Sequence, residues 1–331
     1  MSKILFIGDP HLKITKFNLS MRFLSWLDCT IHELSPDLVV NLGDTFDTHS
    51  VVRSEIMSEF VQHVRHTVER APYIYVLGNH DMYKPSDSTY HALMPLMHVD
   101  NFTVIDKPTQ IGDTTYVPYI HDFKEFPLIK TPICVAHQTF VGCDYGYYRP
   151  DIGVDADKVA AEIIISGHIH KRQMFGKVIY PGTPFAQGLD DINQSKGVML
   201  FDTETYKYEF IESPLPKWRG MKFQIAQDFS VDYMHRQILS ELTEKDHWVL
   251  DMTGPKAELV AYMDSSKLKF LRETYDIRVR ANYTDKIKEK AKIKASSMED
   301  ILFQYINNIY DGALDKGIIK DKALEILRKT P

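Results

Sequence analysis

The sequence contains few cysteines and no long apolar run. Only Cys29, Cys134 and Cys143 occur among its 331 residues, and none forms a C-x-x-C pair. Such a small and odd number of cysteines argues against a disulfide framework and against a thiolate zinc site. It favours a reducing compartment. No run reaches the roughly 18 apolar residues of a membrane span, and the apolar start is interrupted at Asp9. We therefore expect a cytoplasmic protein that neither crosses a membrane nor is exported.

The sequence also lacks a strong excess of either charge. Its 39 Lys and Arg residues nearly balance 45 Asp and Glu residues, which gives a formal net charge of −6. This balance argues against nonspecific binding of polyanions, but a local cleft that carries metal ions could still act on nucleic acid. The length suffices for about two domains of roughly 150 residues each.

The N-terminal half alternates short apolar runs with amphipathic helices. Each run ends in a small residue followed by His, Asp or Asn, and residues 24–34 and 52–68 carry apolar side chains at helical spacing. This alternation predicts an α/β layered domain, in which loops at the carboxyl ends of the strands meet at one crevice. The five runs with their polar ends are residues 4–11, 38–44, 74–81, 133–137 and 163–170.

The polar residues at these strand ends form a set of nitrogen and oxygen donors. Imidazole with carboxylate and amide oxygens, without thiolate, suits Mn²⁺, Fe²⁺ or Zn²⁺. A two-metal site needs a carboxylate shared by both ions, and Asp44 is the natural bridge. Any one of these residues alone would more often be a turn or cap residue, but together they indicate one site. The candidate site residues are Asp9, His11, Asp44, Asn79, His80, Asp81, His137, His168 and His170.

The predicted secondary structure changes after His170. Short strands and turns complete a first domain over residues 1–215, and strand-like runs around a helix near residues 258–271 predict a small α+β domain over residues 216–284. Lysines then alternate from position 286 to position 294, and two amphipathic helices are expected to follow. Residues 285–331 are therefore predicted to form a basic linker and a helical segment.

The strand-end motifs resemble the five phosphoesterase motifs of the calcineurin-like metallophosphoesterase superfamily. Their order and spacing are most similar to the SbcD-type nucleases of double-strand-break repair, which include shorter bacteriophage relatives. The resemblance implies a four-layer α/β sandwich of two mixed β-sheets flanked by helices, a small α+β capping domain and C-terminal helices. The segments that carry it are Asp9-Pro10-His11, Gly43-Asp44-Thr45-Phe46-Asp47, Gly78-Asn79-His80-Asp81, His137 and Gly167-His168-Ile169-His170.

The same resemblance implies a role for each site residue. His80 resembles the catalytic histidine of the family, and Asp81 would orient its ring. Asp47 and His49 depart from the family pattern after the second motif, and we leave both outside the site. Two divalent ions are implied, with Mn²⁺ preferred and Mg²⁺ a weaker substitute. One ion would be held by Asp9, His11, Asp44 and His170, and the other by Asp44, Asn79, His137 and His168.

The implied activity is that of a metal-dependent DNA nuclease subunit, an exonuclease on duplex ends and an endonuclease on single strands. Its partners would be DNA and an SbcC-type, SMC-like ATPase bound through residues 297–331. Whether two copies of the chain also form a homodimer is left open. A phage-encoded chain would act in the host cytoplasm. A small-molecule or nucleotide phosphodiesterase on the same scaffold is the alternative, which the extra C-terminal architecture disfavours. A protein phosphatase is disfavoured because residues 43–48 lack the Arg-Gly of that class and Asp81 replaces its Glu.

Overall fold

The structure, a computed structural model, describes residues 2–49, 51–146, 148–225 and 231–284, together with Gly317, Ile319, Lys320 and Lys322. The predicted linker and C-terminal helices otherwise lie outside the described residues. Two compact units divide the described chain, and the larger contains residues up to 221, 238–250 and 271–278. The predicted boundaries at residues 215 and 284 stay predictions.

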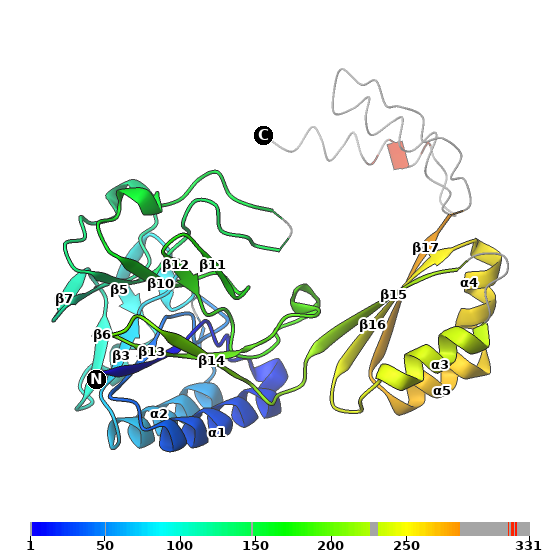
Figure 1. Ribbon diagram of the computed structural model, residues 1–331, viewed down its shortest axis with the longest axis horizontal. Coiled ribbons are helices and arrows are strands. Elements are labelled where there is room, and N and C mark those ends of the chain that lie inside the picture. The colour runs from blue at the N-terminus through cyan, green and yellow to red at the C-terminus, as the bar shows by residue number, and fades with distance from the viewer. Residues whose placement is uncertain are drawn as a thin grey trace. The chain divides into compact units, whose positions relative to one another are not determined.

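The first β-sheet has six strands in the order β14-β13-β1-β2-β3-β6. The four strands from β1 to β6 in this order run parallel, and β13 and β14 join them in antiparallel pairing. A parallel pair needs a crossover connection, and here the first two crossovers are helices α1 and α2 (Figure 1). The bounds are β1 (Lys3–Ile7), α1 (Phe17–Leu34), β2 (Leu38–Asn41), α2 (Ser54–Val68), β3 (Tyr73–Val76), β6 (Phe102–Ile105), β13 (Gly197–Asp202) and β14 (Tyr208–Glu212).

The second β-sheet also has six strands, in the order β11-β12-β10-β9-β8-β7. Its four inner strands run parallel, and the edge strands β7 and β11 pair antiparallel. Both sheets are therefore mixed, as predicted. The bounds are β7 (Thr109–Ile111), β8 (Thr114–Val117), β9 (Ile133–His137), β10 (Ile163–Gly167), β11 (Gln173–Phe175) and β12 (Val178–Tyr180).

Alternating side chains of the strands build separate cores on the two faces of the first sheet. Leu5 and Ile7 of β1 pack with Phe23 and the rest of the buried face of α1 and α2. Ile4 and Phe6 point the other way and pack against the second sheet. The outer face of the second sheet is covered by loops with the short 3₁₀ turns η3 (Phe123–Glu125) and η4 (Ala156–Lys158). The layered α/β fold class is confirmed.

Short elements complete the N-terminal part of the chain, and a small α+β arrangement follows over residues 218–283. The later part has a three-stranded sheet in the order β15-β16-β17, with three helices between its strands. We expected one helix near residues 258–271, but Ser265 Oγ accepts from Leu268 N at 3.2 Å and caps a new helix there. The remaining bounds are η1 (Ile14–Lys16), β4 (Met82–Lys84), β5 (Asp87–His91), η2 (Met94–Leu96), η5 (Leu189–Asp191), β15 (Trp218–Gln224), α3 (Val231–Glu241), β16 (His247–Gly254), α4 (Lys256–Met263), α5 (Ser266–Thr274) and β17 (Ile277–Tyr283).

None of the described helices is long and apolar enough to cross a bilayer.

Candidate metal centre

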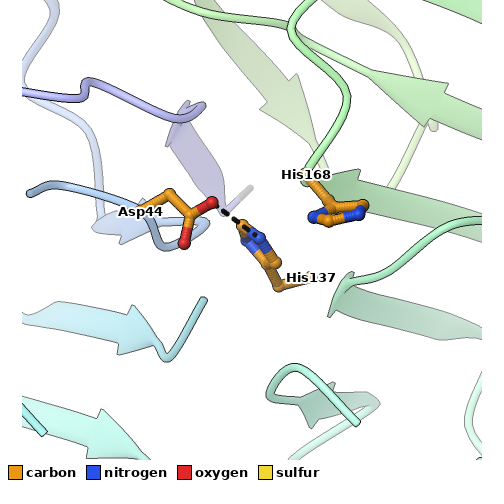
Figure 2. Close-up of side chains that lie close together, drawn as sticks. All are labelled: Asp44, His137 and His168. Carbon is orange, nitrogen blue, oxygen red and sulfur yellow. Dashed lines mark ion pairs between the residues drawn. The ribbon is translucent and has the colours of Figure 1, made fainter. Parts of the chain in front are cut away.

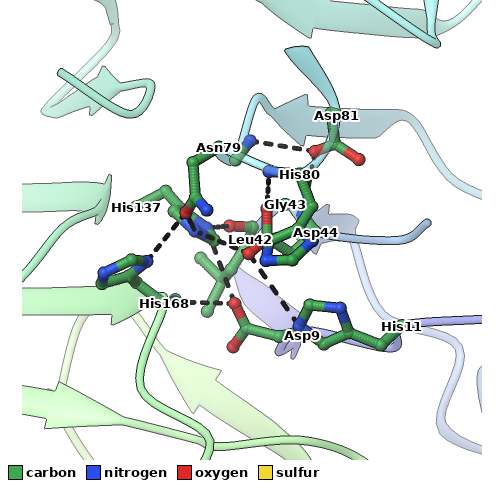
Figure 3. A network of polar contacts seen from close by, with 12 residues as sticks. Asp9, His11, Leu42, Gly43, Asp44, Asn79, His80, Asp81, His137 and His168 are labelled. Carbon is green, nitrogen blue, oxygen red and sulfur yellow. Dashed lines mark hydrogen bonds and ion pairs between the residues drawn. The ribbon is translucent and has the colours of Figure 1, made fainter. Parts of the chain in front are cut away.

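The predicted site residues gather at the carboxyl ends of β1, β2, β3, β9 and β10, where the two sheets face each other (Figure 3). The first sheet supplies Asp9, Asp44 and Asn79, and the second supplies His137 and His168. Parallel strands carry their ligand-binding loops at this end, so residues far apart in sequence meet in one place. The expectation that the motifs form one cluster agrees with this arrangement.

One half of the cluster is a tight group of donors from both sheets. Ligand atoms of Asp44, His137 and His168 lie within 4.8 Å of one another (Figure 2). Asn79 Oδ1 joins them, 3.2 Å from His137 Nε2 and 2.9 Å from His168 Nδ1. His137 Nδ1 donates to the carbonyl of Leu42 at 2.6 Å, so in the neutral ring Nε2 keeps its lone pair and points into the group. This is how metal-binding histidines are oriented in proteins.

The other half of the cluster brings the nitrogens of two imidazoles together beside the Asp44 carboxylate. The Nε2 atoms of His11 and His170 are 3.0 Å apart, and His11 Nε2 lies 3.9 Å from Asp44 Oδ2. Asp9 Oδ2 is buried and has no hydrogen-bond donor among the described residues. A buried carboxylate oxygen without a partner is costly, and a cation would satisfy it. The donors therefore fit a divalent metal ion here as well.

Burial and charge hold His168 and Asp44 in states that can bind a metal, whereas His137 must lose a proton before it can bind one. Burial lowers the pKa of His168 to about 3, so this ring is neutral at pH 7. Burial raises the pKa of Asp44, but the charge of His137 and its hydrogen bond outweigh burial and lower it. Burial lowers the pKa of His137, but the negative charge of Asp44 and its hydrogen bond to the ring outweigh burial and raise this pKa to about 9. A metal ion at His137 Nε2 would take the place of this proton.

The backbone around Asp44 and the neighbouring ligands is strained. Gly43 has a φ of 101°, and a Cβ there would lie 2.6 Å from Gly78 N. Asp44 has a φ of 50°, and His11 and His168 have φ values of 42° and 84°. Such conformations cost roughly 1–3 kcal/mol each and collect at functional sites. The strain thus coincides with three predicted ligands.

The structure corrects the predicted role of Asp81. Its carboxylate turns into the protein and accepts from Asp44 N at 2.8 Å and Gly78 N at 2.9 Å. Within the described residues, no hydrogen bond joins it to the ring of His80. Because these donors sit at the turns of the second and third motifs, Asp81 fixes the position of Asp44 instead.

Two residues outside the predicted site, Asp47 and His49, hold the ring of His80. His80 Nδ1 lies 3.0 Å from the carbonyl oxygen of Asp47, and its ring stacks on His49 with centroids 4.2 Å apart. Their only sequence signal is their place three and five residues after Asp44. Local pattern cannot show that this loop folds back onto His80.

Tyr75 is expected to support the metal site through Asp81. Its hydroxyl donates to Asp81 Oδ1 at 2.9 Å and accepts from Thr45 N at 3.1 Å. Tyr75→Phe should keep the buried ring but weaken Mn²⁺ binding about 10-fold, because supporting hydrogen bonds tune metal affinity by that order. Isothermal titration calorimetry of the metal-free protein with Mn²⁺ measures this change.

The matched control is Tyr73→Phe. Tyr73 lies on the same strand and is equally buried, but among the described residues its hydroxyl accepts only a long bond of 3.3 Å from Asn41 Nδ2. Its Mn²⁺ affinity should stay within about twofold of the wild type. Equal affinities of the two variants would contradict the role given to Tyr75.

A cavity of about 460 Å³ opens onto the cluster. Asp44, Asn79 and His80 line it, together with His168 and His170. Lys13 and Lys171 lie on its wall, each paired with an aspartate. The cavity thus combines metal-binding donors, an imidazole outside the two donor sets and two cations, which suits a phosphate ester.

These features define a metal-dependent phosphoesterase, and the chain belongs to the calcineurin-like phosphoesterase family, whose model matches residues 2–172. The matched stretch contains every predicted site residue, and members of this family use divalent metal ions.

Similar proteins include two from invertebrate viruses and one from a bacteriophage. Protein 078R of Invertebrate iridescent virus 3, a phosphoesterase by name, is 23% identical, and the alignment covers 94% of each chain. Protein 244L of Invertebrate iridescent virus 6, also a phosphoesterase by name, is 27% identical over 69% of this chain and 87% of its own length. Exonuclease subunit 1 of Enterobacteria phage T4 is 24% identical over 82% of this chain and 81% of its own.

Proposed function

We propose that this chain is a two-metal DNA nuclease subunit of the SbcD type. The observation that carries the two-metal part is the position of Asp44 Oδ2. This oxygen lies 3.2 Å from His137 Nε2 in one donor group and 3.9 Å from His11 Nε2 in the other. A carboxylate between two sets of donors is what a pair of ions sharing one phosphate ester requires.

The metal ligands and His80 then have different roles in the reaction. Bound metal ions would activate a water and neutralise charge on the phosphate. His80 is not in either donor set, and it faces the cavity. His80 Nδ1 donates to the backbone carbonyl oxygen of Asp47, because a carbonyl oxygen can only accept a hydrogen bond. The other ring nitrogen, Nε2, is therefore the atom left for the substrate. Protonated at Nε2, His80 can donate to the phosphate or to the leaving oxygen.

DNA as the substrate is supported by the phage relative, whose name describes an exonuclease and which aligns with most of this chain. The test is to incubate the protein with Mn²⁺ and either linear duplex DNA, single-stranded DNA or bis-p-nitrophenyl phosphate. A nuclease should degrade both DNA substrates as well as the small ester. Hydrolysis of the small ester with both DNA substrates left intact would favour the alternative, a small-molecule or nucleotide phosphodiesterase.

The donor set predicts a preference for Mn²⁺ over Mg²⁺. Four of the proposed ligands are imidazoles, whereas Mg²⁺ favours oxygen donors and keeps its waters. After removal of bound metal with a chelator, Mn²⁺ should restore hydrolysis of bis-p-nitrophenyl phosphate at least about 10-fold better than Mg²⁺. Full activity in Mg²⁺, with Mn²⁺, Fe²⁺ and Zn²⁺ absent by elemental analysis, would count against the ligand assignment.

We further propose that residues 297–331 bind an SbcC-type ATPase. The apolar residues there recur at helical spacing after a lysine-rich stretch, and the phage relative is named as a subunit. A chain ending at Ser296 should stay loaded with metal and keep residual nuclease activity, but it should lose ATPase binding and stimulation by ATP. Co-purification with the ATPase, compared with the full chain, measures the loss. Wild-type affinity of the shortened chain would show that docking occurs elsewhere.

A further inference from the structure

Two loops near the cavity are joined by a reciprocal pair of histidine contacts. His80 Nδ1 lies 3.0 Å from the carbonyl oxygen of Asp47, and His49 Nδ1 lies 2.8 Å from the carbonyl oxygen of Asn79. Both acceptors are carbonyls, so both Nδ1 atoms carry a hydrogen. The two rings also stack, with centroids 4.2 Å apart and planes inclined by 21°. Each loop therefore holds the ring of the other.

The stack fixes a ring that has few other constraints. His11 touches the His80 ring edge-on, with centroids 4.8 Å apart, and the Asp47 carbonyl holds one nitrogen. His49 covers one face of the ring, yet it does not line the cavity itself. For a small substrate held in this cavity, the route from His49 to the reaction therefore runs through His80 or through the loop.

We propose that His49 is a positioning residue that holds the His80 ring, so that Nε2 stays directed at the substrate. The inference rests on the catalytic role proposed for His80. Proton donors act only at hydrogen-bond distance, and small displacements of a reacting group cost large factors in rate. Loss of the stack should therefore lower turnover without changing what the site binds.

We expect the chain to tolerate removal of the His49 side chain. This side chain is exposed, and the loop has an independent anchor in the ion pair between Lys13 Nζ and Asp47 Oδ1 at 2.7 Å. No buried contact is lost, so His49→Ala should fold. His49→Phe keeps a ring that can stack but removes the donor to the Asn79 carbonyl.

The experiment uses hydrolysis of bis-p-nitrophenyl phosphate by the full-length, Mn²⁺-loaded protein. His49→Ala should lower kcat about 10-fold, with KM and the Mn²⁺ dissociation constant within about twofold of the wild type. His49→Phe should recover more than half of this loss on a logarithmic scale. The control is His98→Ala, an exposed histidine just after η2, which should behave as the wild type.

A double-mutant cycle with His80→Ala separates this role from a general structural one. If His49 acts through His80, then His49→Ala should change kcat by less than about twofold in the His80→Ala background. An equal loss in both backgrounds, an unchanged kcat in His49→Ala, or a weakened Mn²⁺ affinity would overturn the inference. Wild-type turnover of His80→Ala would instead refute the proposed role of His80, and this inference with it. A small ester serves as substrate, so the result does not depend on DNA being the natural one.

Discussion

Replacing Asp44 with alanine is expected to remove both metal ions and to lower phosphodiester hydrolysis by at least about 10³-fold, because each ion loses a ligand that both share. Asp44 Oδ2 faces both donor groups, and Oδ1 accepts from the backbone of His80 at 2.8 Å. The carboxylate thus also ties the second motif to the third. Elemental analysis of the dialysed protein measures the metal content, and bis-p-nitrophenyl phosphate measures the rate.

Two further variants make the Asp44 result interpretable. Asp44→Asn keeps the shape and one acceptor oxygen for the His80 amide, so it should fold while still losing metal. Asp113→Ala changes an exposed aspartate in the β7–β8 turn and should keep both ions and full activity. Wild-type metal content in a folded Asp44→Ala protein would show that this residue is not the bridge.

Replacing His80 with alanine should separate chemistry from binding. The ring faces the cavity but is in neither donor set, so Mn²⁺ and DNA affinities should stay near those of the wild type. Turnover should fall about 10²-fold or more, as expected for a lost proton donor or electrostatic catalyst. Calorimetry with Mn²⁺ and steady-state kinetics at saturating substrate measure the two effects.

Either of two results would contradict this assignment. Turnover close to that of the wild type would show that another group donates the proton. Loss of one equivalent of metal would make His80 a ligand and would require a new division of the donors. His98→Ala again serves as the matched surface control.

The gathering of the donors could be predicted from the sequence because it depends on short patterns. Each apolar run is a strand, and the polar residues of each motif follow directly, as with Asp9 after β1 and Asp44 after β2. Parallel pairing then brings these ends together without any further information. The alternation of strands and helices likewise predicted the layers.

The contacts that orient the site could not be predicted in this way. His49 and Asn79 are 30 residues apart, and Asp47 and His80 are 33 apart, on loops with no periodic pattern. The direction of the Asp81 carboxylate depends on backbone N–H groups in two separate turns, which residue types do not reveal. Their partners follow from the folded backbone, so sequence reasoning gave Asp81 the wrong role and omitted His49.

We propose that Asp44 lies between two metal ions. The most direct measurement is an anomalous difference map from crystals of the Mn²⁺-loaded protein. A bridging Asp44 predicts two peaks roughly 3.5–4 Å apart, both in contact with its carboxylate. A single peak, or two peaks of which only one contacts Asp44, would contradict it.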